Sequence, residues 1–118
     1  MAGERPHYRL DAWKEAMNLV STVYRATQSF PKEELYGLTS QLRRSAVSIP
    51  SNIAEGAARR GAREFSQFLN IAMGSISELE TQLLIAVDLG YLPNDAPAFA
   101  LLERVSKLVH GLNEHVQR

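Results

Sequence analysis

LTSQLRRSAVSIPSNIAEG, residues 38–56, is the stretch that decides the fold. Its apolar residues recur every three or four positions, which is the period of a helix: Leu38, Leu42, Ala46, Ile49 and Ile53. Pro50 stands inside this pattern, where it lacks the N–H that the helix uses and destabilises it by about 3 kcal/mol. Because the apolar spacing continues past Pro50, we predict a helix that is kinked at this residue and does not end there.

The polar residues of the same stretch form a second stripe at helical spacing. Together with Arg44, this stripe contains Gln41, Ser48, Asn52 and Glu55. A hydrolytic cluster would need a base such as histidine beside the serine, and no histidine lies nearby in the sequence. We therefore interpret the stripe as polar contacts across a helix interface.

Three further segments show helical periodicity. They cover about residues 11–28, residues 62–89, and a final stretch that begins at Asn94 or Asp95 and continues through Val116. The helix that contains Pro50 is expected to begin near Pro31 and to end near residue 58, since proline suits the first helical position. Glycine at positions 61 and 90 marks the connections that follow.

These four segments, with no strand-like alternation between them, predict an all-α protein. The short connections favour an antiparallel up-down-up-down four-helix bundle. The chain is expected to form one domain over residues 1–118, with a loosely ordered segment at 1–9. In the first helix we expect a buried stripe of Trp13, Met17, Val20 and Tyr24, and Gly74 is predicted to let the backbone near Pro50 approach closely.

Composition narrows the function classes. The chain has 118 residues, 45% of them hydrophobic, and no cysteine, which excludes disulfides and thiolate metal sites. Its beginning has no apolar region of the secretory type, and no apolar run approaches the roughly 20 residues of a membrane span, so a cytoplasmic protein is expected.

Charge is unevenly distributed although the formal net charge is zero. Residues 1–63 contain ten Lys/Arg and six Asp/Glu, whereas residues 64–118 contain three Lys/Arg and seven Asp/Glu. Oppositely charged halves favour self-association or internal pairing.

The motifs of known catalytic sites are missing from the sequence. No Glu-x-x-His pair suits a di-iron bundle, and His110 and His115 are too far apart to share a helix face well. The Walker-like spacing of Gly56 and Gly61 lacks the following lysine, because Ala62 and Arg63 stand there. We predict no enzymatic activity, no metal site, no cofactor and no small-molecule substrate.

Two groups of arginines are the candidate nucleic-acid contacts. Arg43 and Arg44 lie in the second helix, and Arg59, Arg60 and Arg63 surround the next connection. The N–H groups at a helix start favour anions, so the second group suits phosphate. A solvated turn, or ion pairs with an acidic partner, is the structural alternative.

The chain resembles the proteins encoded in 23S ribosomal RNA intervening sequences. The resemblance covers about residues 8–92 and is carried by five blocks in order: Trp13-Lys14-x-Ala16-Met17-x-Leu19, Phe30-Pro31-x-Glu33-x-x-x-Gly37-Leu38, Gln41-Leu42-Arg43-Arg44-Ser45, Ser48-Ile49-Pro50-Ser51-Asn52-Ile53-Ala54-Glu55-Gly56 and Gly74-Ser75-x-x-Glu78-Leu79-Glu80-Thr81-Gln82-Leu83.

This resemblance implies a kinked bundle that assembles into a homo-oligomeric ring, typically a pentamer, without enzymatic activity. A related branch, the accessory protein of diversity-generating retroelements, is a basic pentamer associated with nucleic acid. Two functions follow as hypotheses. The first is an oligomeric bundle that binds RNA, DNA or a nucleoprotein through an arginine-rich surface, and the second is a protein–protein interaction scaffold with no nucleic-acid role.

Overall fold

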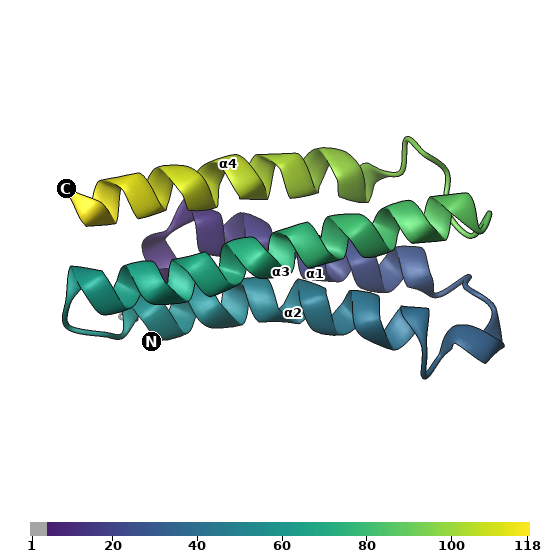
Figure 1. Cartoon of the computed structure of the whole chain (residues 1–118), viewed down its shortest axis with the longest axis horizontal. Coiled ribbons are helices and arrows are strands. Elements are labelled where there is room, and N and C mark those ends of the chain that lie inside the picture. The colour runs from purple at the N-terminus through teal and green to yellow at the C-terminus, as the bar shows by residue number, and fades with distance from the viewer. Residues whose placement is uncertain (1–4) are drawn as a thin grey trace.

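The protein folds into four long helices, as the periodicity predicts. The structure, a computed structural model, describes residues 5–118. The helices are α1 (Asp11–Thr27), α2 (Leu38–Ala57), α3 (Ala62–Asp88) and α4 (Pro97–Gln117), and residues 5–118 contain no strand. Figure 1 shows that each helix runs back along the one before it, so the bundle is antiparallel with up-down-up-down topology.

The four helices form a square in which only neighbours touch. Contacts join α1 to α2, α2 to α3, α3 to α4 and α4 to α1, whereas within residues 5–118 the diagonal pairs do not contact each other. The layer of α1 and α2 therefore lies on the opposite side of the molecule from the layer of α3 and α4.

The start of α2 differs from the sequence prediction. The helix begins at Leu38 and not near Pro31, which precedes a short 3₁₀ helix, η3 (Lys32–Glu34). Gly37 interrupts the chain with a φ of −116° and a ψ of −114°, far from helical values, and the Leu38 N–H donates to Oε1 of Glu34 at 3.2 Å. The glycine therefore separates two helical pieces that periodicity had joined.

Pro50 lies inside α2, which continues to Ala57 without interruption. The prediction that this proline does not end the helix is confirmed. Pro50 is buried, and together with Trp13, Met17 and Val20 of α1 it lines a shallow surface cavity.

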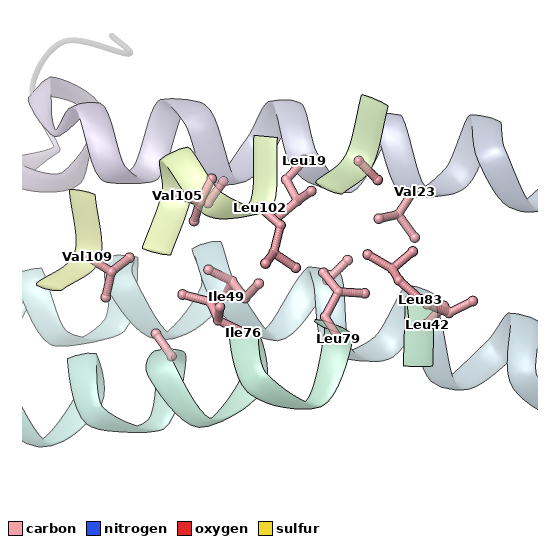
Figure 2. Packing of buried hydrophobic residues seen from close by; sticks show 14 of the residues in the cluster. Leu19, Val23, Leu42, Ile49, Ile76, Leu79, Leu83, Leu102, Val105 and Val109 are labelled. Atoms are coloured by element: carbon pink, nitrogen blue, oxygen red, sulfur yellow. The ribbon is translucent and has the colours of Figure 1, made fainter. Parts of the chain in front are cut away.

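The core is built from one stripe of each helix. Figure 2 shows Leu19, Leu42, Leu79 and Val105, one from each helix, among the side chains that point into the space between the four helices. All four are fully buried. The predicted apolar stripe of α2 is buried along its whole length: Leu38, Leu42, Ala46, Ile49 and Ile53.

In α1 the prediction of the buried stripe was wrong by one position along the sequence. The buried residues are Ala12, Ala16, Leu19 and Val23, whereas Met17 and Tyr24 remain 44% and 40% exposed. The apolar face of this helix is wider than one bundle can cover. The remaining part, which includes the half-buried Trp13 and Val20, faces outward.

Gly74 does not serve as the predicted point of close approach. A Cβ added to Gly74 would meet nothing within 4 Å. The close approach of α2 and α3 occurs instead at Gly56, where an added Cβ would lie 2.8 Å from Phe68 Cβ and 3.2 Å from the Phe65 carbonyl. Glycine is therefore required near the end of α2.

The segment before α1 packs on the bundle. Residues Pro6–Arg9 form a 3₁₀ helix, η2, that contacts α1 and α2. The rings of His7 and Tyr8 lie against Trp13, with centroids 4.9 Å and 5.4 Å away. The predicted loose segment at 1–9 also includes residues 1–4, which lie outside the described residues.

Candidate nucleic-acid interface and polar groove

The turn between α2 and α3 gathers three of the candidate arginines. Arg59 and Arg60 follow the end of α2 directly, and Arg63 is the second residue of α3. All three side chains are exposed. No side chain caps the N-terminus of α3, so the N–H groups of its first turn remain available to an anion.

Arg59 is held in place by two contacts. Its Nη2 donates to Oε2 of Glu55 at 3.2 Å, and its guanidinium lies 4.9 Å from the centre of the Phe68 ring. Because the Arg59 and Glu55 side chains are 41% and 55% exposed, this ion pair contributes little to stability. Glu55, a member of the predicted polar stripe, thus points along its own helix toward the turn.

Arg60 and Arg63 differ from Arg59 in having no ion pair or side-chain hydrogen bond within residues 5–118. Their guanidinium groups are free to pair with an external anion. Arg63 also borders a cavity of about 400 Å³ together with Ser66, Gln67 and Gln117.

Arg43 and Arg44 lie elsewhere on the bundle. About 20 Å of α2, at 1.5 Å per residue, separates Arg44 from the end of the helix at Ala57. Arg43 is occupied, since its Nε donates to Oγ1 of Thr27 at 2.9 Å and its guanidinium lies 4.5 Å from the centre of the Tyr24 ring. The five candidate arginines are therefore split into one cluster of three and a separate pair.

The polar stripe of α2 faces α3 in its middle part. Ser48 Oγ and Ser75 Oγ are 2.7 Å apart, and Asn52 Nδ2 donates to both Oγ and the carbonyl oxygen of Ser48 at 3.0 Å and 2.8 Å. One turn earlier, Ser45 Oγ donates to Oε1 of Glu78 at 3.4 Å. These bonds link the second and third helices through side chains.

Beside these bonds lies a small groove, which we call the α2–α3 groove. It measures about 290 Å³ and is lined by polar residues only: Gln41, Arg44, Ser45, Ser48, Glu78 and Gln82. Gln82 is only 8% exposed, and its Oε1 is buried without a hydrogen-bond donor. Among the described residues, no other buried side-chain nitrogen or oxygen atom lacks a partner.

A second polar cluster, between α3 and α4, was missed by the sequence analysis. Ser66 Oγ donates to Oδ1 of Asn113 at 2.7 Å and accepts from Nε2 of Gln117 at 2.9 Å, and Asn113 Nδ2 donates to Oδ1 of Asn70 at 3.4 Å. Both Ser66 and Asn113 are buried. Asn113 is the signal that could have revealed it, because it occupies the position after Val105 and Val109 in the apolar stripe of α4.

Other chemistry finds little support in residues 5–118. They contain no group of three or more His, Asp or Glu side chains arranged to hold a metal ion. His110 Nδ1 lies 2.8 Å from the carbonyl oxygen of Ser106, one turn earlier in α4. No helix in this part of the chain combines the length and the apolar character that a membrane span requires.

Fold and surface together define a small four-helix bundle with an arginine cluster at one turn and a polar groove along one seam. A comparison with family models finds the 23S rRNA-intervening sequence protein family, whose model matches residues 8–113. The chain belongs to this family. A comparison with curated proteins gives no match.

Proposed function

We propose that this protein is a non-enzymatic, oligomeric helical bundle that binds the backbone of nucleic acid, alone or within a nucleoprotein. The observation that carries the proposal is the position of Arg60 and Arg63, two exposed and unpaired guanidinium groups beside the uncapped first turn of α3. Arg59 completes the cluster and is pre-oriented by Glu55 and Phe68.

The chemistry of this cluster suits phosphate. A guanidinium group can donate two parallel hydrogen bonds to phosphate oxygens, and backbone N–H groups at a helix start can donate more. Phe68 is covered by Arg59, and Phe65 is half-buried, so no aromatic platform is open for stacking bases. We therefore expect contacts to the backbone with little sequence preference.

Self-association is the second part of the proposal, and two opposite faces support it. Within residues 5–118, the layer of α1 and α2 carries nine Lys/Arg and five Asp/Glu through residue 61, whereas the layer of α3 and α4 carries four and seven. Each layer also exposes large apolar side chains: Met17, Tyr24, Leu35, Tyr36 and Val47 on the first, and Ile71, Leu84, Ile85 and Leu89 on the second.

Opposite charge on opposite faces favours head-to-tail contacts, which close into rings. A ring would repeat the arginine cluster around one rim and raise the local potential of a chain whose net charge is zero. The number five comes from the family resemblance. Sedimentation equilibrium should give a closed oligomer, and a monomer at micromolar concentration would refute this part.

The binding test compares two triple variants with equal loss of charge. In the first, Arg59, Arg60 and Arg63 become alanine; in the second, Lys14, Arg25 and Lys107, exposed basic residues elsewhere, become alanine. Fluorescence anisotropy with labelled single-stranded and duplex RNA measures affinity across a salt series. We expect the first variant to lose about tenfold or more in affinity and the second much less.

The salt dependence adds a second measurement. The log–log slope of affinity against salt should become shallower by about 0.7–0.9 for each phosphate that the variant no longer neutralises, and only in the first variant. Equal affinity and slope in both variants would remove the cluster from the interface.

The alternative function is a protein–protein interaction scaffold. The specific observation in its favour is the exposed apolar surface of the first layer, where Tyr36 is 93% exposed. Absence of RNA and DNA binding by the unchanged protein at low salt would favour this alternative.

A further inference from the structure

The α2–α3 groove has the composition of a ligand site and plays no part in the function proposed above. All six of its lining residues are polar, in a protein whose other helix contacts are mainly apolar. Its volume of about 290 Å³ is close to the lower end of the range for small-molecule sites. An occupant should therefore be small and polar.

Gln82 shows that the groove lacks a hydrogen-bond donor. Its Oε1 is buried and unpartnered, which is costly because the amide has lost water without gaining a bond. The neighbouring serines do not supply the donor, because Ser45 donates to Glu78, and Ser48 is engaged with Ser75 and Asn52. The missing partner is a group that carries N–H or O–H bonds.

Glu78 adds negative charge one helical turn from Gln82 and on the same face of α3, since the two residues are four apart. It is exposed, and the Ser45 hydroxyl, at a long 3.4 Å, is its only side-chain hydrogen-bond donor within residues 5–118. A carboxylate beside an unpartnered carbonyl oxygen suits an ammonium or guanidinium group, which can donate to both.

Arg44 provides the opposite charge across the groove. Its side chain is exposed on α2, and it makes no ion pair with Glu78 or with any other described residue. A guanidinium group that only donates suits a carboxylate. The groove thus presents one negative and one positive side chain that do not neutralise each other directly.

From this arrangement we infer that the α2–α3 groove binds a small zwitterion of the amino-acid class. Its ammonium group donates to Gln82 Oε1 and Glu78, and its carboxylate accepts from Arg44. A singly charged ligand would leave one of these two charges uncompensated. The net charge of the site is zero, as is that of the ligand.

The test uses three zwitterions whose charges are increasingly far apart: glycine, β-alanine and γ-aminobutyrate. Acetate and ethylammonium serve as probes with one charge only. Backbone amide shifts in a ¹H–¹⁵N spectrum are followed for residues 41–48 and 78–82 during each titration. We expect one zwitterion to bind with a Kd of about 1–10 mM, and both single-charge probes to bind at least about tenfold more weakly.

Variants locate the response. Gln82→Leu keeps a similar side-chain volume and should fold, while it removes the acceptor and weakens binding about tenfold. Gln67→Leu, the same change at an exposed position of α3, should leave binding unchanged. The inference is overturned if the groove residues do not shift with any zwitterion at about 50 mM, if acetate or ethylammonium binds equally well, or if Gln82→Leu responds like the unchanged protein.

Discussion

The two ends of the α2–α3 interface differ in how completely they are filled. At the turn end, Gly56 brings the helices so close that an added Cβ would overlap Phe68 Cβ at 2.8 Å. At the opposite end, the groove beside Glu78 and Gln82 is open, polar and contains an unpartnered oxygen. One end is therefore optimised for packing, whereas the other gives up stability and keeps chemical groups available.

This difference resembles the usual separation of scaffold and site. Tight packing leaves no room for a ligand, and an unsatisfied buried group persists where something other than stability maintains it. Gly74 belongs to the open part of the seam: it is exposed, and its missing side chain relieves no clash within the described chain. Three substitutions test this contrast, from the largest expected effect to the smallest.

Gly56→Ala should destabilise the protein by about 2 kcal/mol. The new methyl group would meet Phe68 Cβ, which is attached directly to the α3 backbone and cannot rotate away. The usual gain of about 1 kcal/mol for alanine over glycine in a helix is smaller than this strain. Urea denaturation followed by circular dichroism measures the change, and a neutral or stabilising result would contradict the close-packed description of the turn end.

Gln82→Leu should stabilise the protein by about 1 kcal/mol in buffer without ligand. The substitution removes a buried oxygen that has no donor and replaces it with apolar surface of similar volume. Gln67→Leu, on the exposed surface of the same helix, is the control and should change the free energy of unfolding by less than about 0.5 kcal/mol. A loss of stability in Gln82→Leu would show that the amide is satisfied in solution.

Gly74→Ala should stabilise the protein by about 0.5–1 kcal/mol. An added Cβ meets no atom within 4 Å, so the helix-propensity gain is not opposed by a clash within the chain. Thermal unfolding at low protein concentration measures the effect on the chain itself. Destabilisation that appears only at high protein concentration would show that a second copy approaches Gly74.

The candidate site shows how far periodicity reaches. Spacing alone places Ser48 and Asn52 on one face of α2, but it contains no information about Ser75, which lies twenty-seven residues after Ser48 and reaches it across the interface. The same holds for Arg43, whose partners Thr27 and Tyr24 belong to another helix. Neither partner can be found from local spacing, because contacts between helices depend on how both are rotated.

The sequence by itself determined the number of helices, their approximate bounds and the passage of α2 through Pro50. These features depend on local periodicity and on Gly and Pro punctuation, which act within one or two turns. The late start of α2 was the exception, because the effect of Gly37 required a capping contact from Glu34.

Only the tertiary structure decided which part of each wide apolar face is buried. In α1 it turned Leu19 inward and left Met17 exposed, and between α2 and α3 it placed the close approach at Gly56 and the open groove at Gln82. The physical reason is that a helical pattern defines directions relative to its own axis. The rotation of that axis is set by all four helices packing at once.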